Sequence, residues 1–312
     1  MTKKWLGIDM GGTFTKLGIV DGTGKVYGKS KFETKGKQGI DDYVERLTYY
    51  SKELVNQLDM EWKALDGVGL GLPGFIDRKK GWIRHLPSLG WRNIKIKEKL
   101  EQSLQLPIDI DNDANVATLG ECWCGAGKNQ TDVICITIGT GIGVGIIANG
   151  QLIRGQSGLA GEAGHIVIEP DGEPCSCGQR GCMGKIASAT AMVKEANRQL
   201  QAGKETSLKK CSTITTLDIF EAAKTQDQVA TQVIERALTA LTTVMSYLTV
   251  TLNPGLFIIG GGVSHAGDHL LNPLKTKYLD ITQEMMKKDV NIKLATLGND
   301  AGFIGAASLL KE

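Results

Sequence analysis

Three cysteines and one histidine lie close together in the middle of the chain, within the stretch Gly161–Cys182. They are His165, Cys175, Cys177 and Cys182, in the order H-x9-C-x-C-x4-C. Three thiolates and one imidazole form a closed tetrahedral ligand set for Zn²⁺, and four protein ligands leave no position open for a reactive water. The pattern therefore predicts a structural zinc site. The alternative is a group of packing thiols with a hydrogen-bonded histidine.

A carboxylate, Glu162, lies three residues before His165. Glycines at positions such as Gly164 and Gly181 allow the tight turns that would bring all four ligands to one ion. A metal that holds the histidine also fixes the short segment that carries the carboxylate. We therefore expect the substrate to bind beside this loop.

A second polar cluster, Asp111-Asn112-Asp113-Ala114-Asn115, follows a predicted strand and precedes a predicted helix. Polar residues at a strand end beside a helix start are the usual place for chemistry in an open α/β sheet. Asp113, flanked by amides, can take a proton from a hydroxyl group as a general base. The alternative is that Asp113 or Asn115 only caps the helix. Both roles fit together if Asn115 or a neighbour caps while Asp113 faces a cleft.

Glycine-rich turns follow three predicted strands, at Asp9–Thr13 (DMGGT), Gly139–Gly145 (GTGIGVG) and Gly260–Ser264 (GGGVS). Backbone N–H groups without side chains in the way can approach phosphates there. The first two turns lead into another strand, and GxxxxGK[ST] is absent, so neither a P-loop nor a dinucleotide fingerprint fits. A plain glycine hairpin remains the alternative for DMGGT. Two strand–glycine turn–strand units predict a duplicated fold with a cleft between its halves.

The composition favours a two-domain globular enzyme, with 312 residues, 41% hydrophobic and 22% charged. The formal net charge is only +2, and the sequence has no basic tract with interleaved aromatic residues, which argues against nucleic acid as a partner. We expect no signal sequence, and no apolar run approaches the roughly 20 residues that span a membrane. These features predict a protein of the reducing cytoplasm, where zinc–thiolate sites are favoured over disulfides.

Hydrophobic periodicity predicts alternating strands and helices. The predicted strands are Trp5–Asp9, Lys16–Val20, Lys25–Lys29, Leu65–Leu72, Leu106–Ile110, Asp132–Ile138, Leu256–Ile259 and Val290–Leu294. The predicted helices are Gly39–Gln57, Ile94–Leu104, Val116–Gly125, Ala187–Leu200, Thr216–Lys224, Gln226–Leu252 and Phe303–Lys311. Gly81–Trp91 is predicted to be a loop, and the last helix is expected to pack against the first half.

These motifs together resemble the ROK family of sugar kinases. DMGGT, NDAN, GTGIGVG, GE-x-GH with CxCGxxGC, and GGGVS fall in family order along nearly the whole chain. LGWRN, GECWCGAG and LGNDAG look most similar to glucokinases of Gram-positive bacteria. The resemblance implies a two-domain α/β fold of the actin/hexokinase-like (ribonuclease H-like) type with an inter-domain active-site cleft. Residues 1–115, completed by the helix at 299–312, would form one domain, and residues 116–298 would form the other with the zinc-binding loop.

Carried over residue by residue, the resemblance implies that Asp113 is the catalytic base for the sugar 6-hydroxyl. Asn112, Glu162 and His165 match sugar-binding positions, with the Gly74 backbone beside them. His165 would bind Zn²⁺ through one ring nitrogen and face the sugar with the other. The nucleotide side matches Gly11, Gly12, Thr13, Thr140, Gly141, Gly261 and Gly262, with Asp9 placed to orient Mg²⁺. The implied reaction is ATP-dependent phosphorylation of the 6-hydroxyl of a hexose, foremost glucose.

Two positions depart from the family pattern. Gly184 replaces a glutamate that follows the last zinc cysteine, and Ser88 replaces an asparagine before LGW. Losing one charged hydrogen bond weakens binding by about 1.5–3 kcal/mol if nothing compensates. A kinase for an N-acylated hexose such as N-acetylmannosamine, or for a glycoside, is therefore the alternative.

A sugar-responsive transcriptional repressor is a remote alternative, because many family members are repressors. Those proteins carry an amino-terminal helix-turn-helix, whereas this chain is expected to begin at the phosphate-binding strand. The expected partners are a sugar and a nucleotide, with no nucleic acid and no membrane. The resemblance also implies a homodimer or homotetramer.

Overall fold

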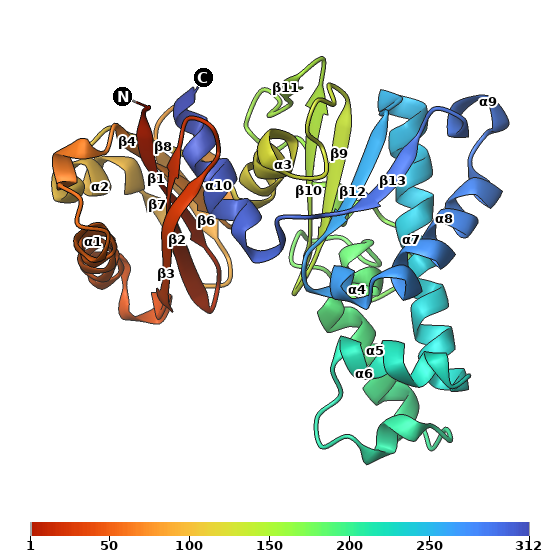
Figure 1. Cartoon of the computed structure of the whole chain (residues 1–312). Coiled ribbons are helices and arrows are strands. Elements are labelled where there is room, and N and C mark those ends of the chain that lie inside the picture. Colours follow the sequence, from red (N-terminus) through yellow and green to blue (C-terminus); the bar gives the residue numbers. More distant parts are fainter. Residues whose placement is uncertain (1, 312) are drawn as a thin grey trace.

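The computed structural model describes residues 2–311 and contains two five-stranded sheets with two helices between them (Figure 1). The strand order is β3-β2-β1-β4-β8 in the first sheet and β11-β10-β9-β12-β13 in the second. In each sheet an antiparallel meander continues into two parallel strands. The same arrangement therefore occurs twice, as the repeated strand–glycine turn–strand units predict.

The first sheet comprises β1 (Lys4–Met10), β2 (Phe14–Asp21), β3 (Val26–Glu33), β4 (Gly67–Leu72) and β8 (Ile108–Asn112). The helices α1 (Ile40–Gln57) and α2 (Ile96–Leu104) cover it with apolar residues at helical spacing. Because β1, β4 and β8 are parallel, their carboxyl ends lie at one edge of the sheet. The residues that follow these three strands therefore meet at that edge.

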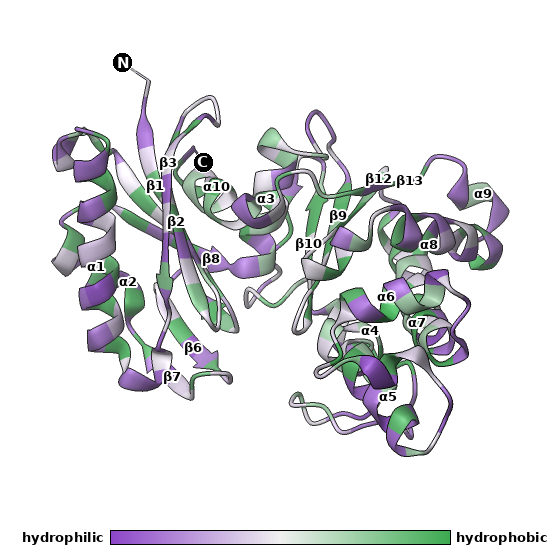
Figure 2. Cartoon of the chain, turned by 60° about the horizontal axis from the view of Figure 1, so that its bottom comes forward, coloured by the Kyte–Doolittle hydropathy of each residue, from purple (hydrophilic) through white to green (hydrophobic). Residues whose placement is uncertain are grey.

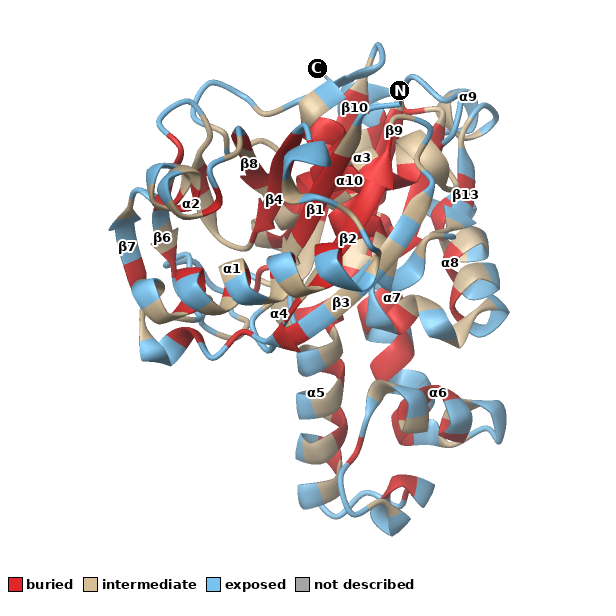
Figure 3. Cartoon of the chain, turned by 60° about the vertical axis from the view of Figure 1, so that its left-hand side comes forward, coloured by how far each residue is buried: buried red, intermediate tan, exposed pale blue. Residues whose placement is uncertain are grey.

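The second sheet comprises β9 (Val133–Ile138), β10 (Ile142–Ala148), β11 (Gln151–Leu152), β12 (Leu256–Gly260) and β13 (Asn291–Leu294). The long helix α7 (Gln228–Leu252) and α8 (Asp268–Ile281) contribute most of the apolar side chains that pack on it. The short helices α4 (Gly184–Ala187) and α9 (Glu284–Lys287) lie beside them. The helices α5 (Ala189–Gln201) and α6 (Thr216–Lys224) project from the rest of the molecule (Figure 3).

Two helices, α3 (Asp113–Cys124) and α10 (Ala301–Ser308), lie between the sheets and pack against each other. Their backbones touch, because a Cβ atom on Gly305 would lie 1.6 Å from the carbonyl oxygen of Val116. One on Gly120 would lie 2.3 Å from the carbonyl oxygen of Ala301. Only glycine allows so close a crossing, so the two helices form a tightly packed bridge between the sheets.

The strands and the helices that pack on them both carry buried apolar residues. Figure 2 shows hydrophobic residues on the central strands of both sheets, and Figure 3 shows β1, β2, β4 and α10 largely buried, whereas the edge strand β3 is mostly exposed or intermediate. No helix in residues 2–311 is long and apolar enough to cross a membrane.

Most predicted elements are present, but three predictions were wrong or incomplete. The predicted loop Gly81–Trp91 belongs to a small antiparallel sheet of β5 (Phe75–Asp77), β6 (Trp82–Leu86) and β7 (Trp91–Ile94), held by buried side chains such as Ile83. The segments that form α8 and α9 were not predicted as helices. The helix α3 begins three residues earlier than predicted, and the proposed domain boundary after residue 115 therefore falls inside it.

Candidate active site and metal cluster

A cleft of about 610 Å³ lies between the two sheets and brings most of the predicted site residues together. Residues from the first half and from the second half both line it. The predicted residues among them are Gly12, Thr13, Gly74, Asn112, Asp113, Thr140, Gly141, Glu162, His165 and Gly261. Gly11 and Gly262 follow the same strands but do not appear in the lining of this cleft.

Asp113 lies at the carboxyl end of β8 and is the first residue of α3. The helix cap is Asn112, whose side-chain oxygen accepts hydrogen bonds from the backbone N–H groups of Ala114 and Asn115 at 2.9 and 3.3 Å. Asn115 is not the cap, because its side chain is buried and donates to Asp111 at 2.8 Å. Asp113 is therefore not the N-cap residue of α3, and it lines the cleft.

Burial raises the pKa of Asp113 to about 7, and the nearby carboxylates of Asp9 and Glu162 add to the effect. The hydrogen bond from the Ala114 backbone N–H, at 2.9 Å, opposes it. A carboxylate with a pKa near neutrality is a stronger base than an ordinary one, and it remains largely ionised slightly above pH 7. The geometry and the pKa therefore both suit proton removal from a bound hydroxyl.

A smaller cavity of about 190 Å³ adjoins Asp113 on the side of β1 and β12. Asp9, Lys16, Gly261 and Asn299 line it. Burial raises the pKa of Asp9, and the charge of Lys16 counteracts this. The Lys16 ammonium also donates to the Asn299 side-chain oxygen at 3.0 Å. A cavity with one lysine and the three carboxylates of Asp9, Asp113 and Glu121, between two glycine turns, suits the phosphate tail of a nucleotide and its cation.

The turn after β12 requires a glycine at position 261. Gly261 has a φ of 80°, and a Cβ atom there would lie 2.4 Å from the carbonyl oxygen of Ile138. The backbone of the third turn thus packs directly against the end of β9, beside the second turn at Thr140 and Gly141. This contact brings the second and third predicted glycine turns side by side.

The four predicted metal ligands converge on one point. The ligand atoms of His165, Cys175, Cys177 and Cys182 all lie within 4.8 Å of one another. Cys175 Sγ is 3.3 Å from His165 Nδ1, and Cys177 Sγ is 3.6 Å from Cys182 Sγ. Such separations match the edges of a tetrahedron around a zinc ion with three sulfur ligands and one nitrogen ligand. The donor set therefore fits Zn²⁺.

The other ring nitrogen of His165 points away from the cysteines. Its Nε2 atom is 3.8 Å from Glu162 Oε2, and both residues line the cleft. On the opposite wall, the Asn112 side-chain amide donates to the Gly74 carbonyl oxygen at 3.3 Å. The predicted sugar-binding residues thus lie on two facing walls, with Asp113 on the same cleft.

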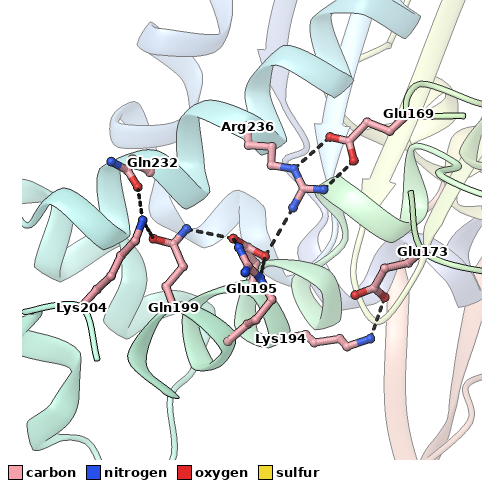
Figure 4. Close-up of polar contacts among 9 residues, drawn as sticks. Glu169, Glu173, Lys194, Glu195, Gln199, Lys204, Gln232 and Arg236 are labelled. Carbon is pink, nitrogen blue, oxygen red and sulfur yellow. Dashed lines mark hydrogen bonds and ion pairs between the residues drawn. The ribbon is translucent and has the colours of Figure 1, made fainter. Parts of the chain in front are cut away.

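Ion pairs attach the cysteine loop to the helices behind it (Figure 4). Arg236 in α7 donates from two nitrogens to the Glu169 carboxylate, at 2.9 and 2.6 Å. Lys194 in α5 donates to Glu173 at 2.6 Å. Arg236 also approaches Glu195 at 3.5 Å, which links the helices to each other. Paired arginine contacts of this kind fix orientation as well as distance, so the loop is held from two helices.

Both positions that depart from the family pattern lie near the cleft. Ser88 lines it directly. Gly184 lines an adjoining cavity of about 390 Å³, which shares His165 and Ser176 with the cleft. A Cβ atom on Gly184 would make one tight contact, 3.3 Å from the carbonyl oxygen of Gly164, and would have no other atom within 4 Å, so a side chain there needs a small shift of that backbone.

Sequence reasoning missed an ion pair between the two halves. Arg154, in the loop after β11, donates to Asp111 at 2.6 Å, and Asp111 is 4% exposed. Asp111 belongs to the polar cluster DNDAN, which was the available signal. Its partner was not predicted, because Arg154 lies in a loop whose sequence has no recognisable pattern.

Comparisons with known proteins agree with this geometry. The ROK family model matches residues 5–312. The glucokinase of Halalkalibacterium halodurans is 38% identical to this chain, covering 100% of the chain and 96% of its own length. That of Thermotoga maritima is 33% identical, covering 99% and 98%. The crystal structure of a ROK family glucokinase from Streptomyces griseus, in complex with glucose and AMPPNP, is 34% identical, with a TM-score of 0.85 and coverage of 98% of both chains. The predicted two-domain actin/hexokinase-like fold is thereby confirmed, and the chain belongs to the ROK family.

Proposed function

We propose that this protein is a glucokinase, which transfers the γ-phosphoryl group of ATP to the 6-hydroxyl of glucose. The observation that carries the proposal is the position of Asp113. It is a carboxylate with a pKa of about 7, on a cleft that also holds two glycine turns and the Glu162–His165 pair. The full-length relatives at 38% and 33% identity are glucokinases, which supports glucose as the acceptor.

In this mechanism the sugar lies between the Asn112 wall and the Glu162–His165 wall, with its 6-hydroxyl at Asp113. Asp113 accepts the hydroxyl proton as the oxygen attacks the γ-phosphorus, while the bond from that phosphorus to the β–γ bridging oxygen breaks and ADP leaves. Backbone N–H groups of the turns around Gly12 and Gly141 contact the phosphates. Positioning and charge stabilisation account for most of the catalysis in such a transfer, and closure of the two halves would exclude water.

The cation that accompanies ATP would be Mg²⁺, held near Asp9 through its water ligands. We also propose that His165, Cys175, Cys177 and Cys182 hold one structural Zn²⁺. The metal would fix the tautomer and direction of His165, since a ligated imidazole has only one ring nitrogen left to offer the sugar. One equivalent of zinc per chain by elemental analysis is the expected result, and active protein without zinc would contradict this assignment.

The alternatives predicted beside glucose are not favoured. The full-length relatives at 33–38% identity carry the glucokinase name, rather than that of an N-acyl hexose kinase or a repressor. Retention of a base-competent Asp113 also supports an enzyme. A cytoplasmic location remains a prediction of the sequence. The predicted homodimer or homotetramer can be tested by size-exclusion chromatography with light scattering.

The decisive experiment is a coupled assay of ADP formation with ATP and a panel of sugars. We expect glucose to give the highest kcat/KM among glucose, mannose, N-acetylmannosamine, N-acetylglucosamine and fructose. A chain with no turnover on any of these sugars would refute the kinase proposal. Turnover restricted to an N-acylated sugar would retain the mechanism and refute glucose.

A further inference from the structure

Glu121 is a carboxylate that the proposed mechanism does not use, and it is among the least exposed charged groups of the molecule. It lies in α3, eight residues after Asp113, which is about 12 Å along the helix at 1.5 Å per residue. Its exposed fraction is 1%. A charge so deeply buried is costly unless hydrogen bonds satisfy both of its oxygens.

The hydrogen bonds of Glu121 go to the backbone of a distant segment. Its Oε1 atom accepts from the N–H groups of Leu297 at 2.9 Å and Thr296 at 3.1 Å. Its Oε2 atom accepts from the N–H of Ala126 at 2.8 Å and again approaches that of Thr296 at 3.2 Å. The Thr296 hydroxyl is a fourth donor to Glu121, at the longer distance of 3.4 Å from Oε2. Both carboxylate oxygens of Glu121 are therefore satisfied by hydrogen bonds.

Thr296 and Leu297 belong to the connection between β13 and α10, where the chain returns from the second sheet to the helices of the bridge. The outgoing crossing is α3 itself. Glu121 therefore links the return crossing to the outgoing one in the bridge between the two sheets.

The same connection continues into the nucleotide end of the cleft. Asn299, two residues after Leu297, accepts the hydrogen bond from Lys16 at 3.0 Å. Asp300 pairs with Lys29 at 2.8 Å. Asn299 and Lys16 line the 190 Å³ cavity beside Asp9 and Asp113, and Glu121 itself contributes to the wall of the same cavity. A shift of the connection would move the group that holds Lys16.

We propose that Glu121 is a positioning residue for nucleotide binding and phosphoryl transfer. By fixing the backbone at Thr296 and Leu297, it holds Asn299 where it aims the Lys16 ammonium at the phosphate cavity. This inference rests on the proposed function in that the ligand of the cavity is the phosphate tail of a nucleotide. It assigns Glu121 no contact with either substrate.

The test is Glu121→Gln, which keeps the size of the side chain. A glutamine side chain has only one acceptor oxygen. Its NH₂ group would therefore face backbone N–H donors, either at Thr296 and Leu297 or at Ala126. We expect the Kd for Mg·AMPPNP, measured by calorimetry, to rise at least tenfold and the KM for ATP to rise with it. The Kd for glucose alone should stay within twofold, because its walls are carried by other loops.

Two further variants make the result specific. Asn299→Ala removes the acceptor of Lys16 on an exposed residue and should give the same loss of AMPPNP affinity. The double variant should be no weaker than the worse single one, because residues acting through one path are not additive. Ser51→Ala is the matched control: it removes a buried hydroxyl that bonds Leu47, lowers stability, and should leave AMPPNP affinity unchanged.

Several outcomes would overturn the inference. One is a Glu121→Gln protein with a lower melting temperature but AMPPNP affinity within twofold of wild type. Additive losses in the double variant would refute the path through Asn299. If Glu121→Gln does not fold, Asn299→Ala decides alone, and normal AMPPNP affinity in it refutes the proposal. A wild-type protein that binds AMPPNP but turns over no sugar would contradict the glucokinase proposal and leave this test intact.

Discussion

Replacing Asp113 with asparagine is expected to abolish turnover and, at the same time, to stabilise the protein above neutral pH. The amide keeps the shape and the oxygen that accepts the Ala114 N–H at 2.9 Å, but it cannot take a proton from the sugar. It also removes a charge that burial and the carboxylates of Asp9 and Glu162 disfavour. Loss of function and gain of stability therefore have one cause.

The magnitude follows from the pKa of Asp113, which rises from 3.8 to about 7 on folding. Below 3.8 the group is protonated in both the folded and the unfolded state, and the substitution changes little. Between the two values only the unfolded state loses its proton, so the stability of the wild type falls as pH rises. Above about 7 the difference levels off at about 4 kcal/mol, at 1.36 kcal/mol per pKa unit.

Urea unfolding of both proteins at about pH 8 and about pH 5 measures this difference through the linear extrapolation of the free energy of unfolding. We expect Asp113→Asn to be more stable by a few kcal/mol at the higher pH and by much less at the lower pH. Asp280→Asn, on the exposed surface of α8, is the control and should show no such pH dependence. Equal stability of Asp113→Asn and wild type at both pH values would refute the raised pKa, and turnover within tenfold of wild type would refute its role as base.

Three other predictions address the base, the cysteine loop and the open wall. The kcat/KM for glucose should fall about tenfold per pH unit below about pH 7, as Asp113 becomes protonated; a profile flat to pH 5 in rate measurements would contradict this. Cys177→Ser should lose zinc by elemental analysis and raise the glucose KM by about tenfold or more, because His165 loses its fixed direction; unchanged KM without zinc would refute the link. Gly184→Glu should fit into the 390 Å³ cavity without unfolding the protein and lower the glucose KM; no change in KM would mean that position 184 does not reach the sugar.

Local patterns in the sequence were sufficient to predict that one histidine and three cysteines come together, and to locate the glycine turns. The four predicted zinc ligands fall within eighteen positions of one loop, so few residues separate them. The strand ends also carry their own signal, so the parallel strands β1, β4 and β8 place their polar residues at one edge. The division into domains remains a proposal, because the bridge of α3 and α10 belongs to both halves.

Pairings between distant segments were not accessible from the sequence. The residues around Arg154 do not indicate that it pairs with Asp111. Likewise, the residues around Glu121 do not indicate that its carboxylate accepts hydrogen bonds from the backbone of Thr296 and Leu297. The small sheet β5–β7 was missed because strands of three to five residues carry too few alternating positions to be told from a loop. The sequence left the cap open between Asn115 and its neighbours, because DNDAN offers several candidates, and only the backbone of Asn112, extended at φ −66° and ψ 148°, decides among them.

Three carboxylates lie around the point where the cleft meets the smaller cavity. Asp9 comes from β1, Asp113 from α3 and Glu162 from the loop before His165, and the first and last both raise the pKa of Asp113. Such crowding makes each ionisation harder, so the charges strengthen the base in the free protein. Lys16 offsets this at Asp9 but is held by Asn299 toward the smaller cavity. A divalent cation carried by a nucleotide would relieve the remaining repulsion, so the arrangement that raises the basicity of Asp113 also favours binding of metal-bound phosphate beside it.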